Sequence, residues 1–147
     1  MKRRIMLLTV AIMMLCLPGC DRGELYHITI KNRTGVEISA LYLAPETNSG
    51  NMQNYLTENL AIDGTVDLSL GRLTEDDVSQ GFVMEACNAE DGSSEKFGML
   101  MIGNGSTVTL YLDVWGLAVA VDMTEEEVRE EIERAKKDAQ SVGKLTE

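Results

Sequence analysis

The sequence is poor in the residues on which most enzymes and metal sites depend. Its 147 residues include one histidine and three cysteines. A histidine-dependent triad would rest on His27 alone, and a metal site with several histidines is excluded. Phosphate-binding glycine loops and the motifs Gly-x-Ser-x-Gly and Cys-x-x-Cys are absent as well. We expect His27 to be a solvated residue on the polar face of a strand, and we assign no catalytic residue.

Positive charge is also scarce, with 13 Lys and Arg against 24 Asp and Glu. Three of the basic residues, Lys2, Arg3 and Arg4, precede Cys20, and no acidic residue does. The chain from Cys20 onward therefore has 10 basic and 24 acidic residues, a net charge of −14. Such a charge opposes binding to a nucleic-acid backbone and to an anionic lipid surface. It does suit a basic partner.

Only one long apolar run is present, the 13 residues from Ile5 to Leu17. It is too short for a transmembrane helix, which needs about 20 residues. The basic segment Lys2-Arg3-Arg4 precedes the run, and Pro18-Gly19-Cys20 follows it. An ordinary secretory signal favours small residues at both cleavage positions, which Leu17 does not satisfy.

This N-terminal pattern resembles the signal peptide of bacterial lipoproteins, although Pro18 is uncommon at its position. The resemblance implies cleavage between Gly19 and Cys20 and attachment of diacylglycerol to the Cys20 sulfur. Two or three acyl chains, palmitate among them, would hold the protein stably on an extracytoplasmic membrane face of the cell envelope. Residues 1–19 would be removed, and residues 20–24 would form a lipidated tether spanning about 14 Å. We expect no cofactor other than this covalent lipid.

Removal of the signal would leave Cys87 without a cysteine partner other than the lipidated Cys20. No intramolecular disulfide framework is then available. Cys87 lies in an apolar segment, and no basic residue stands near it in the sequence to activate a thiolate. We expect it to be a small, buried strand residue.

Residues 25–122 alternate between apolar and polar in short segments separated by turn residues, which predicts β-strands. The segments are 26–31, 36–43, 66–70, 82–88, 96–102, 107–112 and 117–121. About seven strands predict a mainly β domain, an antiparallel immunoglobulin-like β-sandwich. We expect hairpins at Asn32–Gly35 and at Gly103-Asn104-Gly105. We also expect exposed loops at 45–54 and 71–80 and a single helical turn at 55–60.

Residues 123–147 predict an acidic, amphipathic C-terminal helix and tail. Thr124 and Glu127 have the spacing of a capping box, which starts a helix that we expect to end near Gln140. Its apolar stripe is Val128, Ile132, Ala135 and Ala139. The stripe is narrow, so the helix either lies loosely on the sandwich or projects from it.

Residues 27–112 resemble small β-sandwich domains of uncharacterised role in bacterial envelope proteins. The resemblance rests on a strand ending in Asn32-x-Thr34-Gly35, on Asn59-Leu60 before the Asp63-Gly64 turn, and on Asp91-Gly92 between two later strands. Such domains often carry an aromatic residue before the asparagine-leucine pair, for which Tyr55 is the nearest candidate. These are turn and core positions, so the resemblance implies a fold and no catalytic residue.

Three groups of residues have side chains that suit a metal ion or a binding partner. The acids Glu75-Asp76-Asp77 and Glu90-Asp91 suit Ca²⁺ but lack a recognised loop spacing, so we expect solvated loop acids. The soft atoms of Met84, Cys87, Met99 and Met101 suit copper, but we expect Met99 and Met101 to pack in the core. The aromatic residues Tyr42, Tyr55, Tyr111 and Trp115 suit a binding patch, but packing in the core or at its rim is favoured.

The resulting hypothesis is a non-enzymatic, lipid-anchored envelope protein that binds or scaffolds an envelope protein or a glycan near the membrane. An alternative is an accessory hydrolase or carbohydrate-acting enzyme in which Glu75 and Asp77 serve as acid and base. Carboxylates that meet in one cleft would favour the enzyme, and scattered carboxylates would favour the binding module. A third hypothesis makes the helix from Thr124 to Gln140 the docking element.

Overall fold

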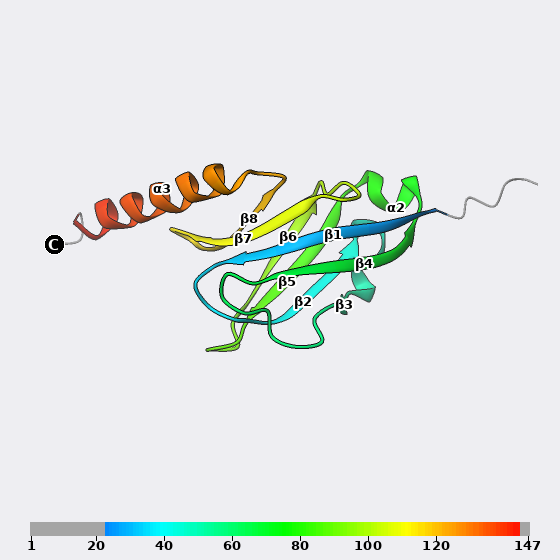
Figure 1. The fold of residues 1–147 in the computed structure, drawn as a ribbon, viewed down its shortest axis with the longest axis horizontal. Helices are drawn as coiled ribbons and strands as arrows, with labels where there is room; N and C mark the ends of the chain where they lie inside the picture. The colour runs from blue at the N-terminus through cyan, green and yellow to red at the C-terminus, as the bar shows by residue number, and fades with distance from the viewer. Residues whose placement is uncertain (1–22, 145–147) are drawn as a thin grey trace, which may run out of the picture.

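The computed structural model of the chain describes residues 23–144. The predicted cleavage site and Cys20 lie outside these residues. Its elements in chain order are β1 (Glu24–Arg33), β2 (Ile38–Pro45), the 3-10 helix η1 (Glu46–Asn51), β3 (Gln53–Asn54), β4 (Thr65–Leu73), α2 (Glu75–Ser79), β5 (Phe82–Asn88), β6 (Ser94–Leu100), β7 (Thr107–Asp113), β8 (Gly116–Val121) and α3 (Glu125–Lys144) (Figure 1).

The strands form two four-stranded sheets that enclose one apolar core. The first sheet has the order β4-β1-β7-β8, and the second has the order β3-β2-β5-β6. Alternate residues of β1 point inward, so that Tyr26, Ile28 and Ile30 are buried as predicted, and His27 is exposed as predicted. The Tyr26 and Phe82 rings meet across the sheets with centroids 5.7 Å apart.

The prediction of a mainly β domain with a C-terminal helix is confirmed, with two differences in detail. The described residues contain eight strands, because the two-residue β3 adds to the seven expected. The sheets are not wholly antiparallel, because β1 and β7 pair in parallel over Thr29–Arg33 and Thr107–Tyr111.

The predicted hairpin at Asn32–Gly35 is wrong, because this turn carries the chain from the first sheet to the second. The fully buried Asn32 explains the crossing. Its amide nitrogen donates to the carbonyl oxygens of Val36, Leu60 and Ala61, and its side-chain oxygen accepts from Thr34. A buried amide needs such partners, so Asn32 ties the turn to a distant loop instead of to a neighbouring strand.

The phase of β2 also differs from the prediction. Alternation from Ile38 would place Ala40 and Tyr42 inside, whereas Leu41 and Leu43 are buried, and Ala44 is buried after them. The register with β5 shifts between Ile38 and Ala40. An irregularity of one residue moves every later side chain to the opposite face, because the period of a strand is two.

The second predicted hairpin is wrong for the same topological reason, since Gly103-Asn104-Gly105 connects β6 of the second sheet to β7 of the first. Asn104 docks the turn against β1 instead. Its side-chain oxygen accepts from the His27 backbone nitrogen at 2.8 Å, and its amide nitrogen donates to the Leu25 carbonyl at 3.0 Å.

Three predicted connections have a different local structure. The 45–54 loop contains η1 and β3. The helical turn at 55–60 is wrong, because Leu60 is held in a bridge to Ile38. The 71–80 loop is wrong as well, because β4 continues to Leu73 and Thr74 then caps the short helix α2.

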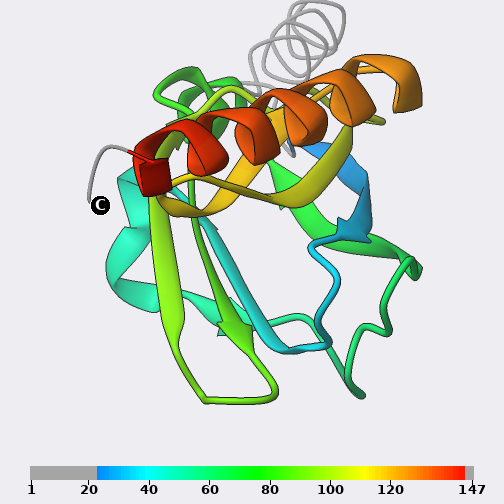
Figure 2. The ribbon, with the colours of Figure 1, turned by 90° about the vertical axis from the view of Figure 1, so that its left-hand side faces the viewer.

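Helix α3 begins with the predicted capping box, in which the Glu127 carboxylate accepts from the Thr124 backbone nitrogen at 2.7 Å. The helix continues to Lys144, beyond the expected end at Gln140. It lies on the sandwich along β7 and extends past the end of the β7–β8 hairpin (Figures 1 and 2). Val128 is buried beneath it, so the apolar stripe faces the sheet. No helix within residues 23–144 has the length and apolar character to cross a bilayer.

Candidate functional site

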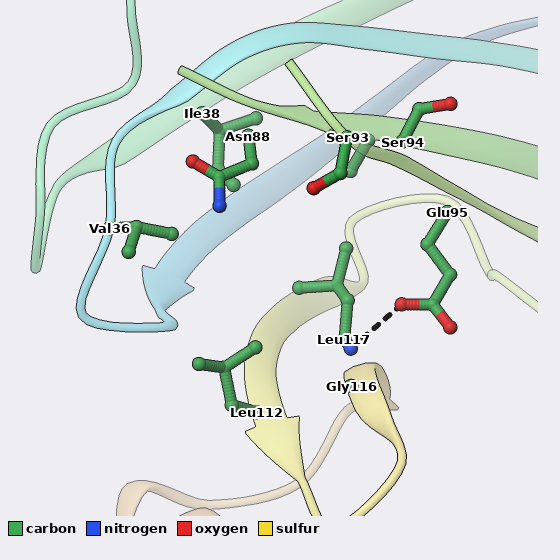
Figure 3. Close-up of a pocket in the computed structure, with 10 residues that line it drawn as sticks. Val36, Ile38, Asn88, Ser93, Ser94, Glu95, Leu112, Gly116 and Leu117 are labelled. Carbon is green, nitrogen blue, oxygen red and sulfur yellow. Dashed lines mark hydrogen bonds between the residues drawn. The ribbon is translucent and has the colours of Figure 1, made fainter. Parts of the chain in front are cut away.

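A cleft of about 360 Å³ opens between the two sheets at the end of the sandwich where β7 turns into β8 (Figure 3). We call this the hairpin end. The β5–β6 turn and the chain leaving β1 border the same cleft, which is where the parallel pairing of β1 with β7 brings the two strand ends together. The inner surface is apolar and comes from Val36, Ile38, Ala86, Leu112 and Leu117.

The polar side of the cleft comes from the β5–β6 hairpin. Asn88, Ser93, Ser94 and Glu95 line it, and Glu95 is the one charged residue among the lining residues. An apolar cavity with a few polar groups at one side is the usual composition of a ligand site.

Glu95 links the two sheets across this cleft. Its Oε2 atom accepts a hydrogen bond of 2.8 Å from the backbone nitrogen of Leu117 in β8 (Figure 3). The residue before Leu117 is Gly116, whose φ of 129° is a conformation that side chains disfavour. A Cβ atom at Gly116 would lie 3.0 Å from Glu95 Oε2. Glycine is therefore needed here both for the turn and for the approach of the carboxylate.

Trp115 stands at the tip of the β7–β8 hairpin, directly before the cleft residues Gly116 and Leu117. Its side chain is 90% exposed, and the nearby Leu112 is 44% exposed. The Asp113 carboxylate accepts from the Trp115 backbone nitrogen at 2.7 Å, which holds the turn in place. The prediction that Trp115 packs in the core or at its rim is wrong, because the hairpin extends beyond the sandwich.

A second groove, of about 400 Å³, lies between α3 and the same hairpin. Its apolar surface includes Leu112, Ile132 and Ala135, and its basic groups are Arg33 and Lys136. Leu112 lines both hollows. The hairpin tip therefore separates a cleft whose charged lining residue is Glu95 from a groove lined by two basic residues and the acidic Asp113.

Two of the acids that the sequence suggested, Asp77 and Asp91, form hydrogen bonds within their own turns. The Asp77 carboxylate accepts from the Thr74 backbone nitrogen at 2.8 Å and from its hydroxyl at 2.9 Å, which completes the cap of α2. Asp91 accepts from the backbone and side chain of Ser93, and these hydrogen bonds lower the pKa of Asp91. Across residues 23–144, no three His, Cys, Asp or Glu residues gather closely enough to hold a metal ion.

The sulfur-containing residues lie in different environments. Met84 is fully buried, whereas Met99 and Met101 are 77% and 65% exposed. The expectation that Met99 and Met101 pack in the core is therefore wrong. Cys87 is half-buried in β5, and burial, with Glu85 adding to it, raises the pKa of its thiol. A reactive thiolate needs a shift in the opposite direction.

The four aromatic candidates do not form one patch. Tyr42 belongs to β2 of the second sheet, and the Tyr55 hydroxyl accepts from Gln53 beside the edge strand β3. Tyr111 belongs to β7, where burial and the nearby Glu131 of α3 raise its pKa. Trp115 alone extends from the hairpin tip.

Sequence reasoning missed the cleft itself. Asn88, Ser93 and Glu95 occupy ordinary turn and strand positions, and nothing in their spacing relates them to Leu117. The segment Asp113-Val114-Trp115-Gly116 could have indicated the site, because its turn residues flank a tryptophan. Turns lie at the surface, so a tryptophan within one is a candidate contact residue.

No protein-family model matches the chain, and no curated protein matches it significantly. Among solved structures, it is similar to one titled "NMR structure of the protein from Eubacterium rectale". The TM-score is 0.50 at 15% sequence identity, and the match covers 75% of this chain and 97% of the other. Similarity at this identity concerns the fold alone.

Proposed function

We propose that the protein is a lipid-anchored component of a bacterial cell envelope and that it binds or scaffolds a partner without catalysis. The anchor is Cys20, which follows a basic segment, an apolar run and Gly19. The sandwich is of the immunoglobulin-like type. Its partner is an envelope protein or a glycan.

The observation that carries the binding role is Trp115, held 90% exposed beside an apolar cleft. A free indole exposes a large apolar area to water, and tryptophan is strongly enriched among the residues that dominate binding energy. The hydrogen bonds at Asp113 and Glu95 order both sides of the turn. An ordered hairpin loses little conformational entropy when it binds.

The arrangement of the acids supports binding over the alternative of a hydrolase. Asp77 is committed to the cap of α2, and the cleft contains Glu95 as its charged residue. A hydrolase of this kind needs two carboxyl groups that face one cleft, and the lining of this cleft includes only the carboxylate of Glu95.

The anchor is tested by growing the producing bacterium with labelled palmitate. We expect the protein to incorporate the label and Cys20→Ala to abolish it, because the sulfur is the attachment atom. Label retained by the Cys20→Ala protein would contradict the proposal.

The binding role is tested by affinity capture from the membrane fraction with native protein, Trp115→Ala and Ile62→Ala. Ile62 is 49% exposed and lies outside the cleft lining, so it is the matched apolar control. Loss of a central anchor residue costs roughly 2 kcal/mol or more, so Trp115→Ala should weaken binding of the captured partner by about 30-fold. Equal capture by Trp115→Ala and native protein would contradict a role for the hairpin.

A further inference from the structure

The chain enters the sandwich at the end opposite the hairpin. Glu24, the first residue of β1, pairs with Leu73, whereas Arg33 at its other end pairs with Tyr111, two residues before the end of β7 at Asp113. Figure 1 shows the start of β1 beside α2 and the hairpin at the far side of the molecule. We call the end where β1 starts the β1 end.

Exposed apolar side chains gather at the β1 end. Leu25 is 47% exposed, and its carbonyl accepts from Asn104 in the turn that follows β6. Met101 precedes that turn and is 65% exposed. The Met101 sulfur lies 3.2 Å from where a Cβ of Gly81 would stand, so this side chain lies over the segment that joins α2 to β5.

Met99 adds to this surface through a strained backbone. The pairing of β5 with β6 is irregular between Phe82 and Met84, and Met99 lies opposite this irregularity with a φ of 57°. Residues other than glycine adopt this conformation only at an energetic cost. The bulge leaves the Met99 side chain 77% exposed on an edge strand. Phe97 and Leu100, on either side of the bulge, pack against the core, whereas Met99 does not.

We propose that Leu25, Met99 and Met101 contact the surface of the membrane that holds Cys20. This inference rests on the proposed lipid anchor. Only Asp21 and Arg22 separate Cys20 from Gly23, so the two Cα atoms are at most about 11 Å apart in an extended chain. The β1 end must then lie at the lipid headgroups, where unbranched thioethers and leucine can enter the acyl boundary.

Charge at the β1 end specifies the kind of lipid. Glu24, Glu75 and Asp76 are exposed there beside the exposed Arg72, and the chain from Cys20 onward has a net charge of −14. An anionic surface would repel these groups, so the contact is with zwitterionic phospholipid. The orientation points the Trp115 hairpin and its cleft away from the bilayer.

The single tryptophan of the chain makes the orientation measurable. The lipidated protein, purified from membranes, is reconstituted into phosphatidylcholine vesicles that contain brominated acyl chains, which quench nearby indoles. Met101→Trp and Leu25→Trp are made in a Trp115→Phe background, and the native protein supplies the matched indole at the hairpin end. Mass spectrometry of each sample determines whether Cys20 carries lipid.

We expect quenching of both new indoles at least about twofold above that of native Trp115, because interfacial side chains penetrate roughly 5–10 Å. Adding phosphatidylglycerol to the vesicles should reduce this quenching. Lipidated protein in which neither new indole is quenched would overturn the membrane contact while leaving the anchor intact. Stronger quenching of Trp115 than of the new indoles would overturn the orientation. Protein without lipid on Cys20 would instead overturn the proposed function, and this inference with it.

Discussion

The hairpin end and the β1 end of the sandwich both expose large apolar side chains, but they present them differently. At the hairpin end an indole stands beside a cleft, on a turn whose backbone nitrogens donate hydrogen bonds to Asp113 and Glu95. At the β1 end the exposed side chains are two flexible methionines and a leucine. A rigid aromatic suits a shaped partner, whereas unbranched thioethers suit a fluid or irregular one. The same exposure thus supports two different kinds of contact.

The separation of the two ends follows from strand pairing. Because β1 and β7 run in parallel, the hairpin after β7 lies where β1 finishes and not where it starts. An antiparallel pair would have placed Trp115 beside the N-terminal segment.

The largest change in stability should come from replacing a methionine that packs in the core and not at the surface. We expect Met84→Ala to lower the free energy of unfolding by about 2–5 kcal/mol, because it leaves a cavity around a fully buried position. The matched change Met101→Ala should lower it by less than about 0.5 kcal/mol. Urea denaturation monitored by circular dichroism measures both. A large loss of stability in Met101→Ala would show that this side chain stabilises the fold, and the contrast between the two ends would then no longer hold.

A smaller effect should come from the glycine that allows the hairpin to approach Glu95. We expect Gly116→Ala to cost about 1–3 kcal/mol, because its backbone conformation and the 3.0 Å approach to Glu95 both disfavour a side chain. Gly92→Ala is the control, since it has a positive φ but no atom within 4 Å of the added Cβ. Adding Glu95→Ala to Gly116→Ala should recover part of the loss. A double variant as unstable as the sum of the single variants would show that contact with Glu95 contributes nothing.

The smallest effect concerns the attachment of α3. Hydrogen bonds from Lys31 and Arg33 lower the pKa of Glu125, whose side chain is 54% exposed. A lowered folded-state pKa adds stability above the pKa of the unfolded chain, and this is lost as pH falls through the folded-state value. Because the pair is exposed, we expect about 0.5 kcal/mol. Denaturation at neutral and acidic pH should show a smaller acid-induced loss in Glu125→Gln than in native protein. An identical loss in both would contradict the role of this ion pair.

Local patterns predicted those elements whose signal lies within a few residues. The Phe82–Asn88 strand has its predicted bounds, and the Thr124–Glu127 capping box starts α3 as expected. Both depend on near neighbours, either alternating side chains or a cap closed over three residues. The end of α3 was less predictable, since the helix continues four residues beyond the expected end at Gln140 to Lys144.

The candidate site was much less predictable. The cleft depends on Glu95 meeting Leu117, residues that are 22 positions apart and have no shared motif. Turn residues correctly predicted that the chain turns at Asn32–Gly35 and at Gly103-Asn104-Gly105. They did not predict that each turn connects the two sheets instead of two paired strands, with Asn32 and Asn104 bonded to distant segments.

The sequence by itself determined the alternating faces of most strands, the start of α3 and the acidic surface, because each depends on residue type and short-range spacing. The tertiary structure decided which strands pair, the parallel alignment of β1 with β7, and the inversion of β2 at its bulge. It also decided that Trp115 is exposed at the hairpin end and that Met99 and Met101 are exposed at the β1 end. A period of two specifies which face of a strand is apolar but not which strand lies beside it. Exposure at the two ends follows from those pairings.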